Sequence, residues 1–267
     1  MTSTSRAVSM FIPHGGGPLP LLNDPSHREV IEFLRGKARQ LLGTPKAIIL
    51  VTAHWEERLP TISSAEQHSL FFDYYGFPKE TYELQYPASG SPLIAEKVKK
   101  ALEKYGFQAK LDAKRGWDHG VFVPLTLLIP DAEIPIVQLS VLTSQAADEH
   151  LKMGEALSEL RNENIAIIGS GMSFHNMKAF QSSGGKHDEN KLFENALQQS
   201  IESGELDKLK NWEQFPGARY CQPQGQAEHF MPLLVAAGAG RENNNSKGKC
   251  VAKLELMGTI VSSYLWT

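Results

Sequence analysis

The sequence predicts an α/β fold, a single domain with a central, largely parallel mixed sheet flanked by helices. Short apolar, β-branched runs recur along the 267 residues, and longer amphipathic stretches separate them. Near-continuous apolar runs are typical of strands covered on both faces. Strands that alternate with helices indicate parallel pairing through crossovers. Because no repeat or linker divides the chain, we expect one domain over residues 1–267.

The elements follow from these patterns in chain order. The apolar runs predict strands at 7–12, 47–52, 134–141 and 165–168. Apolar residues at three- and four-residue spacing, opening near Ser or Asp, predict helices at 26–42, 91–105, 144–161 and 189–203. The tail 250–266, interrupted by Gly258, predicts a hairpin at the sheet edge. Segments 67–87, 182–187 and 241–249 have the composition of loops.

Composition excludes several classes of function. The net charge of -3 and the scattered Lys and Arg residues argue against a nucleic-acid partner. No apolar run approaches the roughly 20 residues that span a bilayer, and the first residues lack a secretion signal. Two cysteines, Cys221 and Cys250, give no sign of a disulfide framework. We therefore expect a cytoplasmic protein that acts on a small molecule away from membranes.

Nine histidines are present, and five of them stand where an element ends and a polar or Gly-rich turn begins. These five are His14, His54, His119, His175 and His229. The remaining four, His27, His68, His150 and His187, lie in polar contexts, where a solvated or capping role is expected.

Three of the five follow predicted strands, at the edge where open α/β sheets bind ligands. His14 precedes three glycines, which could instead form a phosphate cradle or a tight turn, although no Gly-Lys-Ser/Thr follows. His54 lies beside Trp55 and could be a hydrogen-bonded wall residue. His175 follows a Gly-Ser-Gly turn that lacks the Gly-x-Ser-x-Gly spacing of a serine hydrolase. Together the three histidines favour a shared metal site.

The other two histidines have acidic neighbours. His229 lies near the start of an apolar helix, and the adjacent Glu228 is either a ligand or a hydrogen-bond partner. His119 looks like a general base beside Asp118; alternatively, Asp118 caps the next helix and His119 only packs. Imidazoles and a carboxylate without a cysteine cluster suit Fe(II), Zn(II) or another first-row ion, with one coordination face open for substrate.

The chain resembles the class III extradiol ring-cleavage dioxygenases, the LigB-like superfamily, and within it the DOPA 4,5-dioxygenase-like branch. The resemblance covers nearly the whole chain, and the shared motifs follow one another in the same order as in the family. The motifs are HGGGP at 14–18, AHWE at 53–56, FDYYGFP at 72–78, YPA at 86–88, RGWDHG at 115–120, IVQLS at 136–140, IGSG at 168–171 with HN at 175–176, and EH at 228–229 with PL at 232–233.

The resemblance implies a single LigB-like catalytic domain, monomeric or homodimeric, whose metal is held by His14, His54 and His229. His175 stands beside the metal or is a fourth ligand, and His119 is an acid or base. The implied reaction opens a DOPA-like or other substituted catechol with O2. Fe(II) is the implied metal for activity, and Zn(II) is an alternative occupant of the same site.

Departures from the family pattern concern the substrate more than the metal. The first motif reads His-Gly-Gly-Gly-Pro where many relatives have His-Gly-Ser-Pro, and Met172-Ser173-Phe174 replaces smaller residues before His175. Tyr74, Trp117 and Asn176 are candidate substrate-binding residues. For the two aromatic residues, packing in the core or in a loop is an equally good interpretation.

Two other classes of function compete with the dioxygenase. A zinc hydrolase would also use histidines and an acid around an open site to activate water. A Memo-like scaffold would keep the fold for partner binding, but a binding module has no need of an acid–base residue at His119. Metal identity and catechol turnover discriminate between the three.

Overall fold

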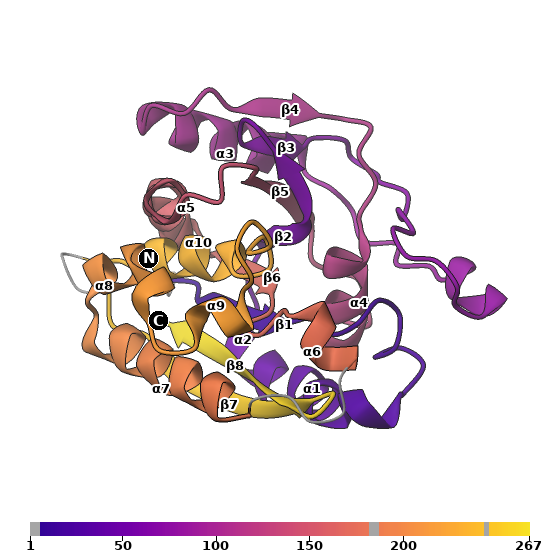
Figure 1. Ribbon diagram of the computed structural model, residues 1–267. Coiled ribbons are helices and arrows are strands. Elements are labelled where there is room, and N and C mark those ends of the chain that lie inside the picture. The colour runs from indigo at the N-terminus through magenta and orange to yellow at the C-terminus, as the bar shows by residue number, and fades with distance from the viewer. Residues whose placement is uncertain (1–5, 182–186, 243–245) are drawn as a thin grey trace.

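In the computed structural model, which describes residues 6–181, 187–242 and 246–267, eight strands form one sheet in the order β4-β3-β5-β2-β6-β1-β8-β7. The four central strands β5, β2, β6 and β1 are mutually parallel, and β8 and β3 join them antiparallel (Figure 1). The strands are β1 Ser9–Pro13, β2 Ala47–Glu57, β3 Thr61–Ser63, β4 Lys110–Asp112, β5 Ile136–Leu142, β6 Ile165–Gly171, β7 Lys249–Leu256 and β8 Thr259–Trp266. The predicted fold class is confirmed.

Helices cover both faces of this sheet. The described helices are α1 Arg28–Phe33, α2 Arg39–Leu42, α3 Pro92–Lys104, α4 His119–Leu128, α5 Ala147–Leu157, α6 Met177–Gln181, α7 His187–Ser203, α8 Leu206–Lys210, α9 Ala218–Cys221 and α10 Met231–Ala239. Side chains alternate along β6. Gly169 therefore faces Pro232 at the start of α10, whereas Ser170 faces the opposite layer and donates to the carbonyl of Gly120 in α4.

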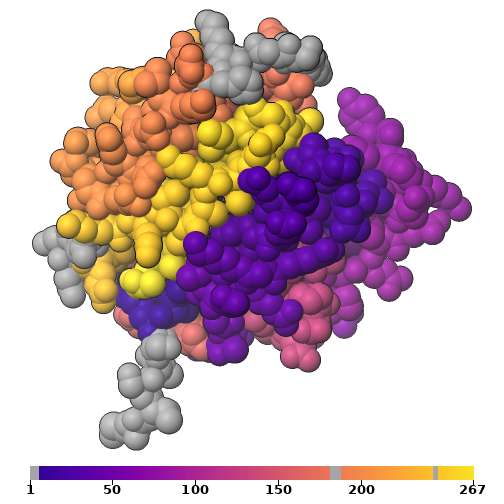
Figure 2. Space-filling view, turned by 90° about the horizontal axis from the view of Figure 1, so that it is seen from below, coloured from indigo at the N-terminus to yellow at the C-terminus, as the bar shows by residue number. Residues whose placement is uncertain are grey.

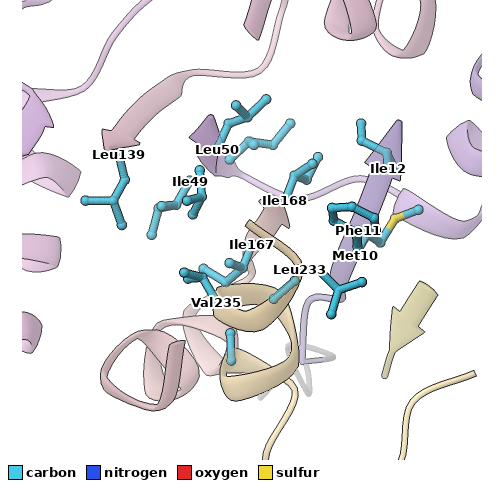
Figure 3. Close-up of a cluster of buried hydrophobic side chains, with 14 of the residues drawn as sticks. Met10, Phe11, Ile12, Ile49, Leu50, Leu139, Ile167, Ile168, Leu233 and Val235 are labelled. Carbon is cyan, nitrogen blue, oxygen red and sulfur yellow. The ribbon is translucent and has the colours of Figure 1, made fainter. Parts of the chain in front are cut away.

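The central strands are buried because both of their faces are covered, as their continuous apolar runs predict. Figure 3 shows the β6 side chains between those of β1 and β2, with side chains of α10 close by. The side chains labelled there are Met10, Phe11, Ile12, Ile49, Leu50, Leu139, Ile167, Ile168, Leu233 and Val235. This rigid core fixes the strand ends that carry the histidines.

Arg161 ties three elements together at the amino end of the central strands. Its guanidinium is fully buried and donates to the carbonyls of Ala7, Ala239 and Trp266, at the starts or ends of β1, α10 and β8. Burial lowers the pKa of Arg161 to about 10, so it stays charged at neutral pH.

We expect Arg161→Met to lower the free energy of unfolding by about 3 kcal/mol or more, because each buried acceptor left unsatisfied costs about 1–3 kcal/mol. Urea unfolding measures this loss. The matched control is Arg39→Met, which breaks an exposed ion pair with Asp131 and should cost about 1 kcal/mol or less. Equal stability of the two variants would contradict the role given to Arg161.

Several sequence predictions need new boundaries. Strand β2 runs five residues beyond the predicted end at 52, because the apolar run stops before the backbone pairing does. The predicted helix 26–42 is divided by a π-helical segment, Leu34–Ala38. The helix expected over 144–161 ends as the 3-10 segment Ser158–Glu163. The short strands β3 and β4 were not predicted, since three residues carry almost no periodicity.

The C-terminal hairpin is confirmed, with β8 paired to β1 and β7 at the edge of the sheet. Figure 2 shows this hairpin, in yellow, between the indigo N-terminal part of the chain and the orange helical segment. Of the predicted loops, 182–186 and 243–245 lie outside the described residues. None of the described helices is long and apolar enough to cross a membrane.

The expectation that His27 and His150 are solvated or capping residues is wrong, because both are fully buried. His27 accepts a hydrogen bond from the backbone N–H of Gly16 and so holds the glycine turn after β1 in place. His150 accepts from the N–H of Leu142 at the end of β5. Each of these imidazoles accepts a hydrogen bond from a backbone N–H at or just after the end of a strand, a contact that the sequence pattern does not reveal.

Candidate active site

Three histidines from distant parts of the chain point their Nε2 atoms at one place. His14 follows β1, His54 lies near the end of β2, and His229 precedes α10. The Nε2 atom of His54 is 3.1 Å from that of His14 and 3.2 Å from that of His229. Imidazoles around one first-row ion, with bonds of about 2.0–2.1 Å, hold their nitrogens about 3 Å apart. The donor set therefore fits a divalent metal.

Local backbone features bring these side chains together. The pairing of β2 with β5 is irregular between Thr52 and Glu56, and such irregularities re-aim a side chain, here that of His54. Gly171 ends β6 against the carbonyl of His229, where any Cβ would clash. This close backbone approach lets the start of α10 reach the site.

The other ring nitrogens of the three histidines face oxygen atoms. His14 Nδ1 lies 3.2 Å from Ser170 Oγ, and His229 Nδ1 lies 3.0 Å from Glu228 Oε1. His54 Nδ1 is 3.6 Å from a carboxylate oxygen of Asp73. Such partners orient a metal-binding imidazole and fix its tautomer. Glu228 therefore has the hydrogen-bonding role in the structure, one of the two that its sequence position allows.

Burial lowers the pKa of His14, His54 and His229 well below the usual value, and the neighbouring histidines lower it further. The three rings are therefore neutral at pH 7. A neutral imidazole keeps a lone pair, which is the form that binds a metal.

His119 opens helix α4 next to this cluster. Its Nδ1 lies 2.9 Å from Asp73 Oδ1, and its backbone N–H donates to the same oxygen. Its ring centre is 3.8 Å from that of His54. With Nδ1 held by Asp73, Nε2 is the nitrogen that is left for chemistry. Although burial raises the pKa of the Asp73 carboxyl, its hydrogen bonds with His119 and its charge interactions with His119 and His54 together lower the net pKa.

His175 stacks on His229, with ring centres 3.5 Å apart and an interplanar angle of 14°. Its Nδ1 is 3.5 Å from Glu228 Oε1. Burial, followed by the nearby His119, lowers the pKa of His175 to about 4. The ligand atoms of His175, Glu228 and His229 all lie within 4.8 Å of one another, so a position beside the metal fits this ring.

A cavity of about 410 Å³ adjoins the histidine cluster, and His119 and His175 form part of its wall. Its other walls come from the glycine turn after β1, the loop before α3, the segment from β6 to α6, and the turn of the β7–β8 hairpin. The lining residues are Gly15, Gly16, Gly17, Leu19, Tyr74, Tyr75, Phe77, His119, Met172, His175, Met177, Phe180 and Met257.

Of the three predicted substrate-binding residues, only Tyr74 lines the cavity. Tyr74 lines the cavity with its ring, while its hydroxyl donates to the carbonyl of Thr81. Trp117 is fully buried, with its ring centre 5.3 Å from that of His68, and does not reach the cavity. The Asn176 side-chain oxygen accepts from the N–H of Ala179, at the start of α6. Trp117 and Asn176 therefore have structural contacts here.

The hydrogen-bond partner of His119 is Asp73, which the sequence did not predict. The sequence interpretation paired His119 with its neighbour Asp118, or gave Asp118 a capping bond. Asp118 instead accepts hydrogen bonds from Thr52 and Gln138, buried beneath the site. Asp73 lies 46 residues before His119. Only its place inside the FDYYGFP motif singled it out.

The chain is similar to proteins named as dioxygenases along almost its entire length. It is 44% identical to the dioxygenase tasH of Hapsidospora irregularis, over 99% of this chain and 87% of that protein. It is 34% identical to the 4,5-DOPA dioxygenase extradiol of Beta vulgaris, over 90% of this chain and 89% of that protein.

A solved structure of an uncharacterized Escherichia coli K12 protein superposes with a TM-score of 0.79 at 27% identity, covering 98% of this chain and all of that one. The family model of the catalytic LigB subunit of aromatic ring-opening dioxygenase matches residues 10–264. With that match and these relatives, the chain belongs to the LigB family, the class III extradiol dioxygenases.

Proposed function

We propose that residues 1–267 form one catalytic domain that opens the ring of a catechol with O2, placing both oxygen atoms in the product. The observation that carries this proposal is the convergence of the His14, His54 and His229 Nε2 atoms beside a cavity walled by His119 and His175. Relatives named as dioxygenases support it.

His14, His54 and His229 would hold the metal, which we propose is Fe(II) in the active protein, with Zn(II) able to occupy the same nitrogens. A redox-active ion there would supply a template for two adjacent hydroxyl oxygens and a path for electrons between ring and O2. Three protein nitrogens leave coordination positions open, as a catalytic site requires.

The residues around the cavity supply proton transfer. We propose that His119 takes a proton from a catechol hydroxyl and returns it later, with Nδ1 anchored on Asp73 so that Nε2 faces the substrate. His175 is the second group that moves a proton or, alternatively, a fourth ligand. Its lowered pKa keeps it neutral at pH 7, so one ring nitrogen retains a lone pair. The ring of Tyr74 forms a wall against the substrate.

Turnover of ortho-diphenols tests the proposal. With Fe(II) restored under reducing conditions, we expect oxygen uptake with catechols and a yellow semialdehyde product. Phenol and resorcinol should be inert, because only two adjacent hydroxyls can chelate one metal. Negligible oxygen uptake with every catechol, in a sample fully loaded with Fe(II), would contradict the proposal. Ester or amide hydrolysis with Zn(II) would instead favour a hydrolase.

A further inference from the structure

We propose that the cavity selects catechols bearing an uncharged, apolar substituent, and that Met257 at the hairpin turn is one of the residues that contact this substituent. This inference rests on the proposed function, since it places the catechol hydroxyls at the histidine cluster. It differs from the substrate in the names of several relatives, because the side chain of DOPA carries both a carboxylate and an ammonium group.

The cavity wall is mostly apolar, and its polar side chains are two histidines and two tyrosines. Within the described residues, its lining contains no Lys, Arg, Asp or Glu. The carboxylates of Asp73 and Glu228 face the histidine rings. The hydroxyl of Tyr74 is held by the carbonyl of Thr81, and burial raises the pKa of Tyr74 to about 12.

A charged substituent would therefore enter this cavity without an oppositely charged Lys, Arg, Asp or Glu side chain in the described lining. Removing a charge from water without an opposite charge or hydrogen bonds is strongly unfavourable. The two carboxylates that hold the histidines would in addition repel an anion. An alkyl or aryl group would instead gain from burial against these walls.

Three methionines give the cavity an adaptable surface. Met172 is buried, whereas Met177 is 52% exposed and Met257 is 39% exposed. Exposed apolar side chains that gather around one opening mark a binding surface. Methionine is flexible and polarizable, so it can follow substituents of different shape. A cavity of about 410 Å³ falls within the range of small-molecule sites, about 300–1,000 Å³.

Met257 occupies a backbone position that does not favour methionine. It is the first of two residues between β7 and β8, with φ of 50°, and Gly258 follows with φ of 77°. Two-residue turns with positive φ at both positions prefer Asn, Asp or Gly. The turn lies at the same end of the molecule as α6, which carries Met177 and Phe180 (Figure 1). Backbone strain of this kind is concentrated at functional sites. Here the strained residue is Met257, whose apolar side chain lines the cavity.

Anaerobic calorimetry on the Zn(II)-loaded protein tests the selectivity without turnover. We expect the affinity to rise about threefold to fourfold per methylene from 4-methylcatechol to 4-butylcatechol. The methyl ester of 3-(3,4-dihydroxyphenyl)propionate should bind at least about tenfold more tightly than the free acid, a larger gain than the about threefold to fourfold that its added methyl group alone would give. Equal binding, or preference for the acid or DOPA, overturns this inference alone. No binding of any catechol contradicts the proposed function itself.

Substitution of Met257 tests its contact with the substituent. Met257→Asn should keep or raise the melting temperature, because Asn tolerates the left-handed backbone. It should also lower the ratio of affinities for 4-butylcatechol over catechol by about tenfold, and Met177→Asn should lower the same ratio. Leu93→Asn, at an exposed position of α3 outside the cavity, is the matched control and should leave the ratio unchanged. An unchanged ratio in Met257→Asn rejects the assignment of Met257, whatever Met177→Asn shows.

Discussion

His54→Ala and His14→Ala proteins are expected to purify folded but with little bound metal and no measurable ring opening. Each substitution removes one of three converging nitrogens and leaves an incomplete set of ligands. Neither imidazole anchors the apolar core, so the fold should survive. Metal analysis of the purified proteins, with circular dichroism as the folding check, measures both effects.

His68→Ala is the matched control for these variants. His68 is a partly buried histidine that bonds the carbonyl of Arg115 and stands apart from the cluster. This variant should keep its full metal content. Unchanged metal in both the His14 and His54 variants would remove the metal site on which the proposed function depends.

The second large effect is expected at His119. His119→Ala should retain metal while its turnover falls by about 10²–10⁴-fold, the usual contribution of a proton-transfer residue. Metal analysis and oxygen uptake on the same preparation separate binding from chemistry. The separation matters because the ligand atoms of His14, His54 and His119 also lie within 4.8 Å of one another.

Asp73→Asn is the companion variant for His119. Asp73 is a positioning residue, because it accepts from both the ring and the backbone N–H of His119. An amide keeps its shape but weakens its hold on the ring, so we expect a smaller loss of turnover and a shifted pH profile. Loss of metal from His119→Ala would make His119 a ligand and give the acid–base role to His175.

Much of the architecture follows from local sequence patterns. The apolar runs that became β1, β2, β5 and β6 are continuous, and continuous runs identify strands buried on both faces whatever the rest of the chain does. Parallel strands end at one edge of a sheet, so histidines placed after such runs are predicted to converge. The structure brings His14 and His54 together in this way.

The sequence by itself thus determined the fold class, the closing hairpin and the candidate set of five histidines, because each depends on a periodicity or motif within one segment. Only the tertiary structure decided that Asp73 holds His119, that Trp117 is buried, and that Met257 lines the cavity. These contacts join segments tens to hundreds of residues apart. Which side chains meet across such distances depends on how strands and helices pack, and no local pattern records that.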